Sequence, residues 1–429
     1  MLLASFAFLG PARAAGAEPL VPQVDAWPLD AATEVALVED HRAPLVSLRI
    51  VFPLGTWSPW FRKAHAEEAF QIQMYDPPGE LRRRADAIGA GVSLDTGDRR
   101  SVLSASCLKE DLPALLDLIR EILANREFDR KELSRWAQSQ KIEWDGSQKD
   151  AEFRASQAIA RMLYPDGDPR RRDYEKPGSV ASDSKRLAEA RDTLIRIPGR
   201  IVAFAGDLTR DEAAGAATAL LPAASSRPPE DIHPVFGPLT PDGKRPRDLV
   251  VKLPRLTQVY FTLVRDMLPV HDPDYPAYVI ANHVLGGHFY SRLYRALRHA
   301  GGDTYGAGSG GPADPVPQDY ALYTFTRTAN SADAENKLRE TLRVFHEKGI
   351  TEAERADAAS YLLGHRPFLR ETPTQVLGRW LYERGFGFPP GFLDDISVRA
   401  SQLDVEEVNR FIARFHDPAQ FTLVRVEPE

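Results

Sequence analysis

The sequence repeats one series of patterns twice, and this repeat limits the possible folds more than any other feature. The two copies are separated by roughly 210–220 residues, which is the size of a domain rather than of a solenoid repeat. In each copy an alternating strand pattern is followed by a helix that ends at glycine, a second strand and further helices. The matched segments are strands 46–52 and 258–264, strands 101–106 and 320–326, strands 200–206 and 420–426, and helices 112–123 and 332–345.

The order of these segments predicts an α+β protein built from two tandem homologous domains. Strands in neighbouring runs and helices in pairs favour an antiparallel sheet with helices packed on one face. We expect the domains to span residues 25–220 and 247–429, joined by a proline-rich linker over 221–246. Asp129 and Thr351 are expected to be the N-caps of corresponding helices in the two copies. The chain has no Walker A motif and no glycine fingerprint after a first strand, which excludes these nucleotide-binding sites.

Composition and the first residues restrict where the protein works. The chain has 54 Lys and Arg against 61 Asp and Glu, so we expect no nucleic-acid partner. Its single cysteine, Cys107, excludes an internal disulfide and a thiolate zinc cluster. An apolar run followed by Ala-x-Ala patterns predicts a signal peptide over residues 1–17, and therefore a periplasmic or secreted protein. This run is shorter than the about 20 residues that span a bilayer, and we expect no membrane span.

Residues 62–74 have the pattern of a helix, on which His65, Glu68 and Ala69 would share one face. With the element order, this segment resembles the M16 (insulinase and mitochondrial-processing-peptidase-like) family over about residues 30–428. The resemblance implies a LuxS/metallohydrolase-like fold and, in the catalytic copy, a His-x-x-Glu-His zinc motif on this helix. A further Glu ligand lies about seventy-five positions later in that family.

The resemblance places His65 at the first zinc ligand and Glu68 at the general base. Ala69 stands where the second histidine would be, and Glu143 is a loose match to the distant ligand. Because a methyl group cannot bind zinc and catalytic zinc has three protein ligands, we expect no metal or other cofactor in this chain. The other interpretation of His65 and Glu68 is a solvated pair on an exposed helix.

A second motif resembles the family more closely. Residues 291–305 read S-R-L-Y-R-A-L-R-H-A-G-G-D-T-Y, where the family has a stretch resembling S-R-L-x-x-x-L-R-E-x-x-G-L-A-Y. The resemblance implies that Arg298 and Tyr305 reach the peptide substrate beside the zinc of the other half-molecule. A guanidinium and a phenol can both donate hydrogen bonds to a peptide carbonyl and to the oxyanion it becomes. Alternatively, Arg298 stabilises a helix C-terminus and Tyr305 is an ordinary strand residue.

Together these motifs predict that the chain is the zinc-less subunit of a heterodimeric M16-type peptidase. We expect this subunit to have no catalytic activity by itself. Its partners would be a peptide substrate and an M16-type zinc peptidase subunit that carries the zinc. The alternatives are an M16-like scaffold or binding protein with no role in proteolysis, and a self-sufficient zinc peptidase with a non-standard ligand set.

The pair His283 and His288 is not expected to bind metal, because a spacing of five does not place both on one helical face.

Overall fold

The computed structural model describes residues 23–74, 79–124, 128–174, 183–225, 227–299, 304 and 306–429. The predicted signal peptide over residues 1–17 and the candidate site residue Tyr305 lie outside the described residues. Within the described part, no helix is both long enough and apolar enough to cross a bilayer.

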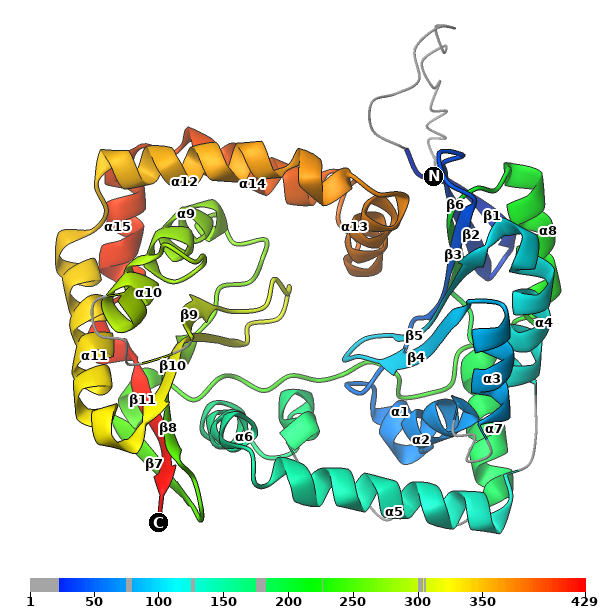
Figure 1. Ribbon diagram of the computed structural model, residues 1–429, viewed down its shortest axis with the longest axis horizontal. Coiled ribbons are helices and arrows are strands. Elements are labelled where there is room, and N and C mark those ends of the chain that lie inside the picture. Colours follow the sequence, from blue (N-terminus) through cyan, green and yellow to red (C-terminus); the bar gives the residue numbers. More distant parts are fainter. Residues whose placement is uncertain are drawn as a thin grey trace, which may run out of the picture.

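The first half of the chain forms a six-stranded sheet with the strand order β1-β2-β6-β3-β5-β4 (Figure 1). Its strands are β1 Asp25–Asp30, β2 Thr33–Glu39, β3 Leu45–Phe52, β4 Gly91–Thr96, β5 Ser101–Leu108 and β6 Arg200–Gly206. All neighbours are antiparallel except β2 and β6, which are parallel. One face is covered by helices of the same half, mainly α4 (Leu112–Leu123) and α8 (Arg210–Leu220).

The second half repeats this arrangement in a five-stranded sheet with the order β7-β11-β8-β10-β9. Its strands are β7 Asp248–Leu253, β8 Gln258–Asp266, β9 Ala307–Gly310, β10 Asp319–Arg327 and β11 Thr422–Pro428. The last strand of this half, β11, again pairs in parallel with the first, β7. Its own helices α9 (Tyr275–Leu285), α11 (Ser331–Lys348) and α15 (Val405–Phe415) cover one face. The order β2-β6-β3-β5-β4 thus recurs strand for strand, and the predicted α+β class and internal repeat are confirmed.

The predicted helix starts are also present. Asp129 and Thr351 each form a capping box, at the starts of α5 (Arg130–Ser147) and α12 (Glu352–His365). In both boxes the cap side chain accepts a backbone N–H and a Glu three residues on bonds back to the cap. A capping box satisfies backbone N–H donors that would otherwise lack a partner at a helix N-terminus. These two residues therefore define the helix starts through local contacts alone.

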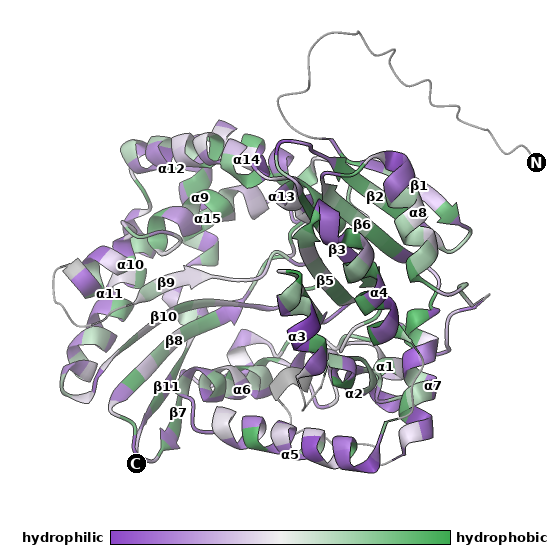
Figure 2. Cartoon of the chain, turned by 45° about the vertical axis from the view of Figure 1, so that its right-hand side comes forward, coloured by the Kyte–Doolittle hydropathy of each residue, from purple (hydrophilic) through white to green (hydrophobic). Residues whose placement is uncertain are grey.

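The second face of each sheet is covered by a helix from the other half of the chain. Helix α13 (Pro373–Phe386) packs its Leu377 and Leu381 on β2, β3 and β6 of the N-terminal sheet. Helix α6 (Ala151–Leu163) packs on β7, β8 and β11 of the C-terminal sheet (Figures 1 and 2). The sequence patterns predicted helices on one face only, and they gave no sign of this exchange. The two halves therefore hold each other through two reciprocal helix–sheet contacts.

Candidate functional site

The segment resembling a zinc helix is broken at His65. Helix α1 (Pro59–Lys63) ends before this residue and α2 (Ala66–Gln71) begins after it. His65 has φ 57°, in the left-handed region, so one continuous helix over 62–74 is a wrong prediction. Arg186 donates from Nη2 to the Lys63 carbonyl oxygen over 2.6 Å and so satisfies a carbonyl near the break.

The break separates the environments of the three motif positions. His65 Nδ1 lies 3.2 Å from Glu68 Oε1, and both side chains are partly buried, so they are not the fully solvated pair of the alternative interpretation. Ala69 is fully buried, in a cluster with Trp136 of α5 and Leu187 of α7 (Ser184–Ile195). The methyl group therefore fills a core position between three helices.

These residues do not fit a catalytic zinc ion. Glu143 is exposed on α5, and Ala69 faces the core. Among the residues that the structure describes, no group of three or more His, Cys, Asp or Glu side chains is arranged to hold a metal. Since zinc catalysis needs three protein ligands and an open position, we assign no step of hydrolysis to this segment.

Arg298 lies in an unusual helical turn beside two aromatic rings. The short helix α10 (Arg292–Tyr294) continues as a π-helical turn over Arg295–His299. Such turns are rare and often occur at functional sites. Arg298 donates from Nη1 to the Tyr294 hydroxyl, and its Cζ lies 5.3 Å from the ring of Phe289 and 5.1 Å from that of Tyr294. The guanidinium thus lies against a pair of rings whose centres are 4.2 Å apart, in the last turn of this helical segment.

Several other matched positions of the same motif serve the fold. Arg292 makes a bidentate ion pair with Glu354 over 2.9 and 2.6 Å, and Leu293 and Leu297 are fully buried. Burial acts to raise the pKa of Glu354, but hydrogen bonds from Arg292 and the Thr351 backbone outweigh it and lower that pKa to about 2. The ion pair between Arg292 and Glu354 therefore anchors the turn that carries Arg298 to helix α12.

The sequence analysis missed the aromatic neighbours of Arg298. Phe289 and Tyr294 come from the segment H-F-Y-S-R-L-Y, in which three aromatic residues precede the turn. This density of aromatic residues next to a candidate binding arginine was the available signal. Their proximity to the guanidinium depends on the π-helical turn, which has no clear sequence pattern.

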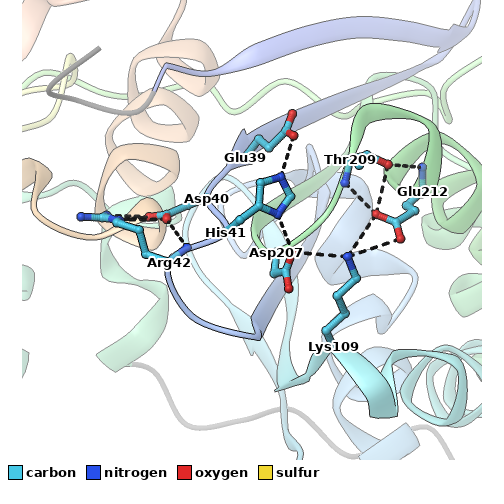
Figure 3. A network of polar contacts seen from close by, with 8 residues as sticks. All are labelled: Glu39, Asp40, His41, Arg42, Lys109, Asp207, Thr209 and Glu212. Atoms are coloured by element: carbon cyan, nitrogen blue, oxygen red, sulfur yellow. Dashed lines mark hydrogen bonds and ion pairs between the residues drawn. The ribbon is translucent and has the colours of Figure 1, made fainter. Parts of the chain in front are cut away.

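A separate polar network joins the ends of β2 and β6 (Figure 3). His41 lies between two carboxylates, with Nδ1 2.5 Å from Asp207 Oδ1 and Nε2 2.8 Å from Glu39 Oε1. Lys109 Nζ lies 3.3 Å from the same Asp207 oxygen. The hydrogen bonds to Asp207 and Glu39 raise the pKa of His41 above its ordinary value. This network is remote in sequence from the predicted site and ties the parallel strand pair at one end.

A comparison with known protein families finds a match in the middle of the chain. Residues 198–362 match the model described as the peptidase M16 inactive domain. The "Non-peptidase homolog YmxG" of Helicobacter pylori (strain ATCC 700392 / 26695) is 28% identical over 129 residues. The aligned part is 30% of this chain and 30% of that protein.

Solved structures show the same fold over nearly the whole chain. A peptidase M16 inactive domain from Pseudomonas fluorescens has a TM-score of 0.76 at 19% identity, covering 95% of this chain and 98% of that one. A protease from Helicobacter pylori has a TM-score of 0.77 at 14% identity, with 95% and 100% covered. The periplasmic protease PqqL from Escherichia coli has a TM-score of 0.68 at 16% identity. It covers all of this chain, which spans 49% of PqqL.

The match over residues 198–362 does not include position 69, where the sequence has Ala in place of a second zinc-ligating histidine. The whole-chain fold and the matched segment agree with each other and with the repeat seen in the sequence. Residues 198–362 therefore match a peptidase M16 inactive domain, and the chain as a whole shares the fold of solved structures that include such a domain.

Proposed function

We propose that this chain is the zinc-less subunit of an exported, heterodimeric M16-type peptidase. It forms half of the substrate chamber and contributes Arg298 and Tyr305 to the peptide, while a partner chain with an intact zinc helix carries out hydrolysis. Residues 1–17 direct the chain to the periplasm, as a signal peptide would. We also propose 25–220 and 247–429 as its two domains.

The burial of Ala69 is the observation that carries the proposal. A buried methyl group at the second ligand position leaves His65 without a second histidine beside it, yet the Arg298 motif keeps its register. A chain that lacks the metal machinery and retains the substrate-binding motif fits one half of a two-part enzyme.

In this proposal Arg298 binds and orients the peptide and does not exchange a proton. Its guanidinium can donate to the carbonyl oxygen of the scissile bond and to the oxyanion formed there. The Tyr294 hydroxyl and the Phe289 ring hold the group in place. Removing one such donor costs about 10²–10³ in kcat where it has been measured in other enzymes.

The test combines the purified chain with an M16 chain from the same source that carries His-x-x-Glu-His. We expect the two to co-elute and to hydrolyse peptides only together. Arg298→Ala is expected to lower kcat about 100-fold without loss of co-elution. Arg295→Ala is the matched control, because Arg295 is exposed in the same turn and makes only a 3.9 Å ion pair.

Other outcomes would favour the other candidate functions. Unchanged hydrolysis in Arg298→Ala, with the partner active alone, indicates a scaffold or binding protein. Peptide cleavage by the lone chain with zinc retained after dialysis indicates a self-sufficient peptidase. Cell fractionation of the full chain tests export, and a cytoplasmic location would contradict that part of the proposal.

A further inference from the structure

A group of exposed aromatic side chains lies next to Arg298. Phe289 and Tyr290, between α9 and α10, are 58% and 68% exposed. Tyr361 on α12 and Phe368, in the turn that follows it, are 48% and 58% exposed. Single exposed aromatic residues are ordinary, but a connected group marks a binding surface. We call these four residues the aromatic patch.

A stack of rings connects the two segments that form the patch. His288 and His283 lie 4.0 Å apart with an interplanar angle of 2°. The stack continues from His283 to Tyr361 over 4.6 Å, from Tyr361 to His365 over 5.2 Å and from His365 to Phe368 over 5.9 Å. His288 Nδ1 also lies 2.7 Å from the His283 carbonyl oxygen. These contacts hold Tyr361 and Phe368 against the histidines of the stack, which lowers the entropy cost of binding there.

One ring of the stack, His283, has a strongly lowered pKa. Burial, and secondarily the nearby His288, lower the pKa of His283 to about 4, so its imidazole is uncharged. An uncharged ring costs little to cover with a ligand, whereas an imidazolium would first have to lose its water. The surface therefore suits an apolar or aromatic group rather than a cation.

The guanidinium of Arg298 lies at one end of the patch. Among the described residues, no carboxylate lies within ion-pair distance of Arg298, although Arg292 in the same segment is paired with Glu354. The Arg298 Cζ lies 5.3 Å from the centre of the Phe289 ring. The site thus presents an aromatic ring and an available guanidinium side by side, and a complementary ligand carries an aromatic group and an anion at similar spacing.

We infer that this surface selects peptide segments in which an aromatic residue is followed two positions later by Asp or Glu. Alternate side chains of an extended peptide point to the same face, roughly 6.6 Å apart, which is close to the spacing of the ring and the guanidinium. The aromatic side chain packs on Phe289 and Tyr290, and the carboxylate pairs with Arg298. This inference rests on the proposed function, because it specifies the class of peptide bound at the same site.

The test measures binding of three blocked peptides to the full chain by calorimetry. The reference peptide is Ala-Ala-Phe-Ala-Glu-Ala-Ala, and the other two replace its Phe by Ala or its Glu by Gln. We expect each replacement to weaken binding about tenfold. Phe289→Ala should abolish the preference for Phe, and Arg298→Ala should abolish the preference for Glu over Gln. Ile142→Ala, an exposed apolar residue on α5, and Arg295→Ala are the matched controls and should change neither.

The outcomes separate this inference from the proposed function. Equal affinity for the three peptides, or no binding of any, overturns the inference. Hydrolysis with the zinc-bearing subunit that still depends on Arg298 would leave the proposed function standing in that case. Sedimentation of wild type and Phe289→Ala checks self-association, and a dimer lost in the variant shows that a second copy occupies the patch and also overturns the inference. Circular dichroism confirms that each variant is folded.

Discussion

Asp394 is a single buried carboxylate surrounded by three arginines. Its Oδ1 lies 2.9 Å from Arg379 Nη2 and 3.8 Å from Arg366 Nε, and Arg370 pairs with the other oxygen. The arginines come from the end of α12, the turn after it and α13, and Asp394 lies on α14 (Phe392–Gln402). The carboxylate therefore fixes the segment that positions α13 against the other half.

We predict that Asp394→Ala lowers the free energy of unfolding by about 1–3 kcal/mol. Removing the buried carboxylate leaves three partly exposed guanidinium groups close together without their counter-charge. Asp395→Ala is the control, since Asp395 is exposed and lies 3.9 Å from Arg399, and should change stability by less than about 1 kcal/mol. Urea unfolding measures both. Equal effects of the two substitutions on the free energy of unfolding would show that the buried position of Asp394 among the three arginines does not stabilise the fold.

Restoring the missing histidine should not restore a zinc site. Ala69→His places an imidazole in the fully buried cluster of α2, α5 and α7, and we expect a loss of at least about 1–3 kcal/mol in unfolding free energy. Gln71→His, on the same helix but partly exposed, should stay within about 0.5 kcal/mol. Metal analysis after dialysis with zinc should find no stoichiometric zinc in either variant. One zinc per chain in Ala69→His would show that the helix break is reversible.

At the scale of the element, the parallel pair β2–β6 depends on charged groups at its end. His41 follows β2 and lies between Glu39 and Asp207, which follow or end the paired strands (Figure 3). Because the pKa of His41 is raised in the folded chain, the folded state binds its proton more tightly than the unfolded state does. This contribution to stability is complete below the unfolded pKa of about 6.5 and is lost as pH rises through the folded value.

We therefore predict that His41→Gln destabilises the protein at pH 6 and that this destabilisation decreases as the pH rises above the unfolded pKa. The effect is small because the imidazole is half exposed and screened by solvent. His233→Gln, an exposed histidine of the linker, is the control and should show no pH-dependent difference from wild type. Thermal unfolding of wild type and both variants over pH 5–9 measures the difference in stability. A constant difference at all pH values would mean that the ring packs and does not act through its charge.

At the scale of the whole molecule, the exchange of α6 and α13 makes the two halves interdependent. Without α13, the N-terminal sheet would expose the fully buried residues Ala36, Val38 and Ala203 to water. Without α6, the C-terminal sheet would expose Val424 and Val426. Neither half can bury both faces of its sheet alone, although each has a core of its own on the other face.

We predict that a chain divided between Pro228 and Pro229 in the linker folds only when both fragments are present. Fragments 18–228 and 229–429 should each lack a cooperative urea transition, and an equimolar mixture should recover one. The matched control is the intact chain with a flexible Gly-Ser insertion at the same point, which should unfold almost as wild type does, because lengthening a loop costs little. A cooperative transition in either isolated fragment would contradict this prediction.

The sequence predicted what depends on local pattern. Alternation identified β3 and β10, helical spacing gave α4 at its observed bounds, and the capping residues Asp129 and Thr351 began their helices. These signals work because each residue's preference is decided within one turn or one strand. Because the same patterns occur in both halves, the local predictions could be combined into a repeated two-domain arrangement. The absence of the second histidine is visible at a single position, Ala69.

Three features depended on tertiary contacts. The parallel pairing of β6 with β2, the placement of α6 and α13 on opposite halves, and the ring stack around His283 each join segments far apart in the chain. Strand β6 does carry a hint, since it is buried along its full length and a continuous apolar run indicates cover on both faces. The sequence alone therefore predicted many of the elements and their repetition and, through the family resemblance, the absence of a second histidine at Ala69. Only the tertiary structure decided which surfaces pack together. Burial of apolar area is favourable for any complementary apolar surface, whatever the position of its residues in the sequence.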